Sequence, residues 1–244
     1  MLPSNVTKAV AEIRTINPMP VADSHNDIIA NISFSQDLEA NVDVSYTFSG
    51  YCAMGIREAV LLLPEDKKKN LIQTIVSIAG KSEDIQKSAV TGEAFENYSS
   101  GAPVLIKATV SAPQFTEKAG AKYIFKVGDV IGKQSELYQT SQRKQPVDIE
   151  YPHSLNRTLT VNIPNGYTIL NPETLTMKSE CKDEKGEVGA SFVSSYKIEG
   201  NKLVVNIVEF YSQLHYRISD FENFRKVINA AADFNKITLL LAKS

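Results

Sequence analysis

Apolar and polar residues alternate along the first clearly patterned stretch of the chain, residues 28–48. In its second half, one set of alternate positions is apolar and the set between them is polar. The apolar set is Leu38, Ala40, Val42 and Val44, and the polar set is Glu39, Asn41 and Asp43. A period of two is typical of a half-buried antiparallel strand. With a polar turn at residues 35–37, the pattern predicts a pair of strands.

A helical spacing replaces the alternation in residues 51–82. Ile56, Val60 and Leu63 recur at helical intervals up to Pro64, which ends one helix or begins the next. A second apolar stripe then follows, made of Leu71, Ile72, Ile75, Val76 and Ala79, with Gly80 as a C-cap. The pattern predicts two consecutive helices.

Strand patterns return downstream, punctuated by glycine and proline. Residues 102–115, 122–132, 147–151 and 157–164 are each predicted to contain a strand, and Gly200–Asn201 is predicted to turn a hairpin. Residues 236–242 close the chain as a buried strand, and Ile13 to Ile16 can add an edge strand. His25, in the polar stretch "DSHND", and His153, directly after Pro152, are both expected in turns.

One more helix is predicted near the end of the chain. Residues 219–222 read "SDFE", in which Ser219 and Glu222 have the spacing of a capping box. Phe221, Phe224, Ile228 and Ala231 then line one face. A helix that begins at this cap is therefore expected.

The order of elements predicts a mainly β protein: an antiparallel, jelly-roll-like β-sandwich with two or three peripheral helices. Residues 1–22 are read as a lead-in segment. Residues 23–145 are read as a first β-rich half with helices, and residues 146–244 as a second β-rich half with a C-terminal helix and strand. The two halves form either separate units or one continuous domain.

The charge of the chain narrows the choice of partners. The 244 residues carry a net charge of −2, with a pI of about 6.0, so no global field attracts nucleic acid. The basic run 141–145 holds only Arg143 and Lys144, and we read it as a connector between the two halves. No apolar run approaches the roughly 20 residues of a membrane span, so we expect no membrane insertion.

Cys52 is the strongest candidate for catalysis, because it lies near the start of a predicted helix, where a thiol can be activated. A buried structural cysteine is the alternative. The available bases are His25, His153 and His215, and none lies in a strand followed closely by Asp or Asn. We therefore expect no catalytic residue. Cys52 and Cys181 are compatible with one disulfide or with two free thiols.

Two groups of carboxylates are further candidate sites. Asp23 and Asp27 flank His25, a set that can ligate a divalent metal, yet no second cluster completes the site. Glu39, Asp43 and Glu209 would suit glycoside hydrolysis only if they faced one cleft, and a solvated sheet face is the simpler reading. No glycine-rich phosphate loop is present. We expect no metal site and no cofactor.

Three segments together resemble a known family. They are residues 143–152, which end in "PVDIEYP", the segment "LTVNIPNGYTI", and the closing helix "FENFRKVI" with its terminal strand. They resemble the domain of unknown function that follows the papain-like core of bacterial transglutaminase-like proteins. The segments "NPMPVADSHNDI" and "SGYCAMGIREAV" also look like the earlier part of that region. In that family the catalytic Cys, His and Asp belong to the upstream core, so none is carried over here.

The resemblance implies a non-catalytic accessory module that packs against the core or binds a protein partner. It also implies a periplasmic or cell-surface location. An independent glycan-binding β-sandwich is the first alternative, and it requires clustered aromatic side chains such as Tyr46, Tyr196 and Tyr211. A thiol enzyme using Cys52 is the second, and it requires a histidine within hydrogen-bond reach.

Overall fold

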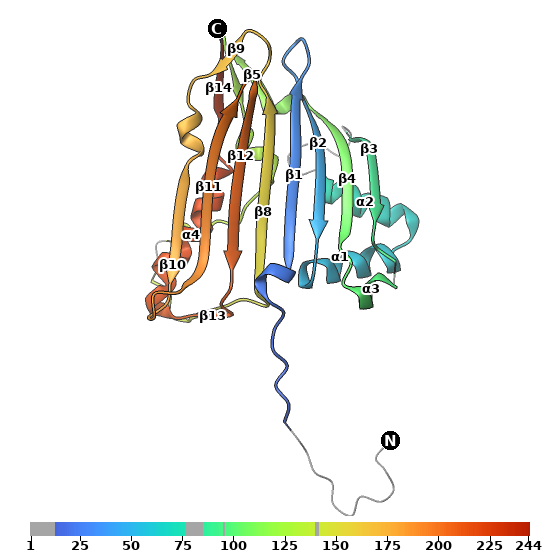
Figure 1. Cartoon of the computed structure of the whole chain (residues 1–244), viewed down its shortest axis with the longest axis vertical. Helices are drawn as coiled ribbons and strands as arrows, with labels where there is room; N and C mark the ends of the chain where they lie inside the picture. The colour runs from blue at the N-terminus through green and yellow to red at the C-terminus, as the bar shows by residue number, and fades with distance from the viewer. Residues whose placement is uncertain (1–12, 77–84, 95, 140–141) are drawn as a thin grey trace, which may run out of the picture.

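A computed structural model describes residues 13–76, 85–94, 96–139 and 142–244. Its largest element is an eight-stranded sheet with the strand order β10-β11-β12-β8-β1-β2-β4-β3 (Figure 1). The strands are β1 (His25–Phe34), β2 (Ala40–Phe48), β3 (Ile85–Thr91), β4 (Val104–Ala112), β8 (His153–Asn162), β10 (Met177–Lys182), β11 (Val188–Glu199) and β12 (Lys202–Tyr211).

A second, four-stranded sheet faces one end of the first and has the order β5-β6-β14-β9. Its strands are β5 (Thr116–Ala119), β6 (Lys122–Phe125), β14 (Leu239–Lys243) and β9 (Tyr167–Ile169). The rings of Phe34 on β1 and Phe125 on β6 meet edge-to-face at 5.2 Å. A two-stranded ribbon, β7 (Val147–Asp148) and β13 (His215–Tyr216), completes the β structure of the described residues.

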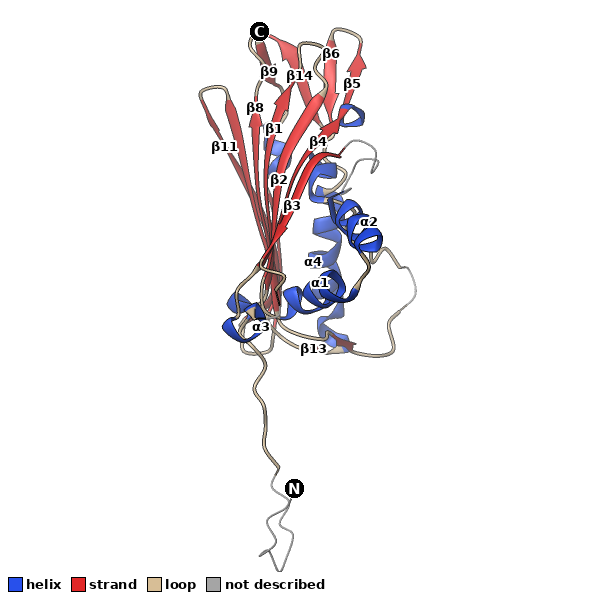
Figure 2. Cartoon of the chain, turned by 90° about the vertical axis from the view of Figure 1, so that its right-hand side faces the viewer, coloured by secondary structure: helices blue, strands red, loops and turns tan. Residues whose placement is uncertain are grey.

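The longer helices lie on one side of the large sheet (Figure 2). They are α1 (Tyr51–Leu62), α2 (Glu65–Val76) and α4 (Phe221–Phe234). Helix α4 packs on β10 and β11, whereas α1 packs on β1, β2 and β4. Shorter helical turns are η1 (Val21–Asp23), α3 (Asn97–Ser100), η3 (Pro113–Phe115), η4 (Val127–Ile131), η5 (Pro172–Leu175) and η6 (Ile218–Asp220).

The core lies between the large sheet, the helices and the small sheet. Alternate residues of each central strand point into it, for example Leu203, Val205 and Ile207 of β12, all at most 2% exposed. We call this the inner face of the sheet. Within the described part of the chain, none of the helices or strands covers the opposite, outer face (Figure 2).

The mainly β class and the peripheral helices are confirmed. The hairpin at Gly200–Asn201, the two consecutive helices and the closing strand lie where the pattern predicted them. One pairing differs from a purely antiparallel sheet, because β1 and β8 run parallel. This pairing joins strands from residues 23–145 and 146–244 in one sheet.

Several local expectations were wrong. Residues Ile13 to Ile16 form no strand, and Ile13 is 97% exposed. Only the start of residues 122–132 is a strand, since residues 127–131 form η4. His25 and His153 do not lie in turns, because each begins a strand. Asn26 and Asp27 follow His25 along β1, so the expectation that no histidine lies in a strand followed closely by Asp or Asn was wrong for His25. The expected C-cap at Gly80 and the stripe residue Ala79 lie outside the described residues.

The predicted capping box is absent from the start of α4. The helix begins one residue later than the box requires, after the turn η6, and its N-cap Asp220 makes no side-chain capping bond. Asp220 instead accepts hydrogen bonds from Arg217 (2.8 and 3.0 Å), and Glu222 pairs with Arg225. The two residues of the predicted box therefore have other partners, because the Ser219 hydroxyl donates to Asp220 (3.2 Å) and the Glu222 carboxylate pairs with Arg225. The predicted apolar face is present, with Phe221, Phe224 and Ala231 buried.

Candidate functional site

Cys52 lies in the first turn of α1, as the sequence predicted. The chain enters the helix through Gly50, whose φ of 53° favours glycine and whose Cβ position lies 2.4 Å from the Asp23 carbonyl oxygen. This close approach brings Cys52 Sγ to 3.8 Å from Ser24 Oγ. Cys52 and Cys181 are both free thiols.

The surroundings of Cys52 do not activate its thiol. Burial raises the pKa of Cys52, and nearby Asp27 raises it further, while hydrogen bonds from Ser24 and Tyr151 act in the opposite direction. A higher thiol pKa means less of the nucleophilic thiolate at neutral pH. Among the described residues, none of the three histidines hydrogen-bonds to Cys52.

Each histidine has a different partner. His25 Nδ1 lies 3.0 Å from Asp27 Oδ2, and His215 Nδ1 lies 2.7 Å from Asp148 Oδ1. His153 Nδ1 lies 2.9 Å from the backbone oxygen of Tyr151, and the Tyr151 ring packs on the rings of both Tyr51 and His153. The cysteine and histidines therefore do not come together as a thiol enzyme requires.

The candidate carboxylates for metal binding or glycoside hydrolysis are not brought together either. The described residues contain no group of three or more His, Cys, Asp or Glu side chains that could hold a metal ion. Asp43 points to the outer face of the sheet, where it accepts a hydrogen bond from Thr109 (2.7 Å). Glu209 points to the inner face and is 5% exposed, so the expectation that it belongs to a solvated face was wrong.

Glu209 belongs instead to a polar cluster under the helices. The cluster consists of Asn26, Tyr46, Arg157, Glu209 and Tyr211. The register pairs Arg157 with Ile207 and Glu209 with Leu155, so the two charged residues are diagonal neighbours on the inner face. Glu209 Oε1 accepts a hydrogen bond from the Tyr211 hydroxyl (2.6 Å), and Arg157 Nη1 donates to the Asn26 backbone oxygen (3.3 Å).

The electrostatics of this cluster combine burial with opposite charge. Burial raises the pKa of Glu209, while the Tyr211 hydrogen bond, Arg157 and His153 lower it. Burial lowers the pKa of Arg157, and Glu209 opposes that effect. Because arginine keeps its proton in proteins, a permanent positive charge lies beside the Glu209 carboxyl.

The alternation along β12 and β8 in the sequence also indicates this buried cluster. Glu209 and Tyr211 share the alternation of Leu203, Val205 and Ile207, so the same pattern that buries the apolar residues buries them. Arg157 likewise continues the buried series of Leu159 and Val161. A polar residue in phase with an apolar series is thus a candidate for a buried polar site.

The tyrosines expected on a glycan-binding face do not form an exposed platform. Tyr46 and Tyr211 are 3% and 4% exposed and belong to the buried cluster, and Tyr196 is half-buried on β11. Stacking on sugars needs accessible rings, so this arrangement gives the glycan alternative no support.

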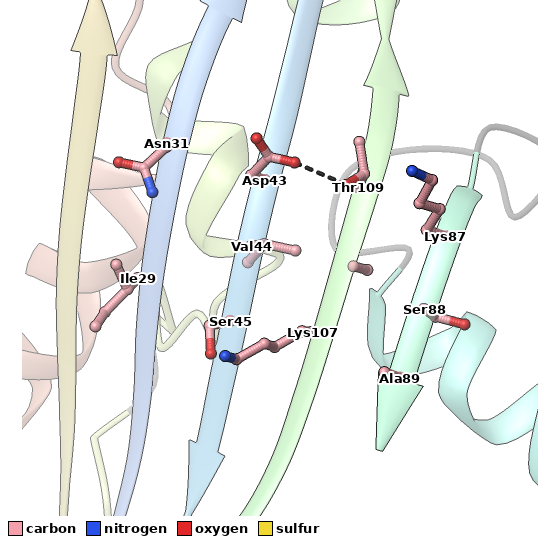
Figure 3. Close-up of a pocket in the computed structure, with 11 residues that line it drawn as sticks. Ile29, Asn31, Asp43, Val44, Ser45, Lys87, Ser88, Ala89, Lys107 and Thr109 are labelled. Atoms are coloured by element: carbon pink, nitrogen blue, oxygen red, sulfur yellow. Dashed lines mark hydrogen bonds between the residues drawn. The ribbon is translucent and has the colours of Figure 1, made fainter. Parts of the chain in front are cut away.

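The outer face carries a shallow groove of about 630 Å³ over β1, β2, β4 and β3 (Figure 3). Cross-strand pairing arranges its side chains in two rows. One row is Asn31, Asp43, Thr109 and Lys87, and the other is Ile29, Ser45, Lys107 and Ala89. Asp43 is engaged by Thr109, whereas Lys87 and Lys107 form no hydrogen bond or ion pair within the described residues.

Comparison with known protein families matches part of the chain. Residues 122–241, from β6 to β14, match the family model of a domain of unknown function, DUF3858. The match covers a little under half of the chain. No curated protein matches the chain, and no solved structure matches it.

The match supports a domain of unknown function in this part of the chain, as the resemblance implied. It does not extend to a transglutaminase-like core, and the expected link to such proteins stays a proposal. Among the described residues, helices long and apolar enough to cross a membrane are absent.

Proposed function

We propose that this chain is a non-catalytic accessory module of a transglutaminase-like bacterial envelope protein. Its outer sheet face docks against the papain-like core of that protein, in the periplasm or at the cell surface. The observation that carries the proposal is the uncovered outer face itself (Figure 2). The family resemblance of the sequence supplies the identity of the partner.

The size of the outer face suits a protein partner. Eight strands about 4.8 Å apart, each about 30 Å long, present roughly 1,000 Å². A specific protein interface of standard size buries about 800 Å² on each partner. The outer face is therefore large enough for such an interface without help from other surfaces.

The chemistry of the outer face also suits a protein partner. Polar residues dominate it, with exposed apolar side chains at Ile29 (53%) and Val208 (49%). Mixed surfaces of this kind are typical of interfaces between separately folded domains. Lys87 and Lys107 add two positive charges that lack partners in the described chain, so the docking surface of the core is expected to be acidic there.

Reversing these two charges tests the proposal. The core encoded upstream in the natural gene is produced separately and titrated with this chain by calorimetry. We expect saturable binding that weakens at least tenfold when Lys87→Glu and Lys107→Glu are combined, because like charges then meet. The matched control combines Lys133→Glu and Lys226→Glu, two exposed lysines outside the outer face, and should bind as the unmodified chain does.

Two results would overturn the proposal. One is a natural gene with no transglutaminase-like core. The other is equal binding by the outer-face variant and the control variant, with circular dichroism showing that both are folded. Hydrolysis or transfer of amide substrates that depends on Cys52 would favour the thiol-enzyme alternative instead.

A further inference from the structure

A small cavity lies on the other side of the sheet, between β8, β12 and helix α4. Its volume is about 200 Å³. Pockets for drug-sized ligands measure about 300–1,000 Å³, so this cavity suits a smaller molecule. The residues that line it are Gln134, Ser135, Ile149, His153, Leu155, Glu209, Tyr211, Phe224, Ile228 and Ala231.

The polar atoms left over in this lining are mainly hydrogen-bond acceptors. Glu209 Oε1 accepts a hydrogen bond from the Tyr211 hydroxyl. No described group hydrogen-bonds to the second carboxylate oxygen of Glu209, Oε2. His153 Nδ1 faces a backbone oxygen, which can only accept, so Nδ1 carries a proton and a neutral ring leaves Nε2 as an acceptor.

Gln134 follows the same pattern. Its Nε2 donates to the backbone oxygens of Ile131 (3.1 Å) and Gly132 (3.0 Å), which leaves its side-chain oxygen as the remaining polar atom. A ligand that matches a carboxylate oxygen, a ring nitrogen and an amide oxygen carries several N–H donors.

Aromatic and aliphatic side chains form the remaining walls. The rings of His153 and Tyr211 lie 5.1 Å apart, and those of Tyr211 and Phe224 lie 5.9 Å apart. Tyrosine and phenylalanine faces attract cations, and most strongly where water is excluded. Leu155, Ile228 and Ala231 provide an apolar surface beside them.

We propose that this cavity binds a small primary alkylammonium ion. The ammonium group donates to Glu209 and lies against the Tyr211 and Phe224 rings, and a short alkyl chain packs on Leu155 and Ile228. The proposal is independent of docking at the outer face, because the cavity lies on the opposite side of the sheet.

The positive charge of Arg157 lies close to the proposed ammonium site. Its guanidinium is 6% exposed, and the hydrogen bond that it makes in the described structure is to the Asn26 backbone. Burial raises the pKa of Glu209, and the positive charge of Arg157 opposes part of that effect. The Glu209 Oε2 atom accepts no hydrogen bond from a described donor, and a bound ammonium ion would add a second positive charge that favours the carboxylate form.

Binding of n-butylammonium at neutral pH tests the proposal, with chemical shifts and calorimetry as readouts. We expect saturable binding by the full chain, at least tenfold tighter than binding of the neutral analogue 1-butanol. Glu209→Gln should weaken n-butylammonium binding at least tenfold while leaving 1-butanol unchanged. Glu173→Gln, an exposed carboxylate on η5, is the matched control and should bind normally.

The unmodified chain and a second variant provide two further tests of the proposal. Equal binding of n-butylammonium and 1-butanol to the unmodified chain would overturn the proposal, as would absence of binding. If Glu209→Gln does not fold, Ile228→Trp should fill the cavity without touching the carboxylate and abolish binding. Retained binding in a folded Ile228→Trp variant would place the ligand elsewhere and overturn the assignment.

Discussion

Replacing Phe234 by alanine is expected to lower the free energy of unfolding by about 3–5 kcal/mol. Phe234 is fully buried at the end of α4, and its ring lies 6.0 Å from that of Phe192 on β11, which is also fully buried. Truncation removes apolar contact between the helix and the large sheet and leaves a cavity that neighbouring strands cannot collapse to fill.

Urea denaturation followed by circular dichroism measures this effect. The matched control is Asn223→Ala, an exposed position on the same helix, which should change the free energy of unfolding by no more than about 0.5 kcal/mol. A loss below about 1.5 kcal/mol for Phe234→Ala would contradict the packing of α4 on the sheet.

Gly128→Ala is expected to destabilise the protein by about 2–3 kcal/mol, as overpacking does in a rigid core. Gly128 lies in η4, and its amide donates to the Ile237 oxygen (3.0 Å) while its own oxygen accepts from Asn235 Nδ2 (2.8 Å). An added Cβ would lie 2.3 Å from the Phe234 oxygen and 2.5 Å from the Asn235 oxygen. Backbone atoms cannot move aside cheaply, so the turn after α4 must shift.

Gly55→Ala is the matched control, because the same methyl group meets no atom within 4 Å there. Gly55 lies inside α1, where alanine is favoured over glycine by up to about 1 kcal/mol. The two substitutions should therefore change the melting temperature in opposite directions. Equal or reversed shifts would contradict the close approach of η4 to the end of α4.

Much of the fold was predictable because burial follows the alternation of each strand. The series Leu38, Ala40, Val42 and Val44 is buried as predicted, with Asp43 facing solvent. The Gly200–Asn201 hairpin was predictable because its turn is local. The parallel pairing of β1 and β8 was not, since it joins residues about 130 positions apart and leaves no local signature.

The candidate sites were harder to predict, because they too depend on strand pairings that leave no local signature in the sequence. Arg157 and Glu209 are neighbours only because β8 and β12 pair in one register, and neither strand alone indicates the other. The outer-face rows depend in turn on four strands and three registers. Sequence alternation assigns each side chain to a face, but the register decides which side chains meet.

Zero-length carbodiimide cross-linking of the full-length natural protein, analysed by mass spectrometry, tests the docking of the outer face most directly. The reagent joins a lysine only to a carboxylate in direct contact. We predict links from Lys87 or Lys107 to Asp or Glu residues of the transglutaminase-like core. Links from Lys133 or Lys226 to the core, with Lys87 and Lys107 unlinked, would contradict the account.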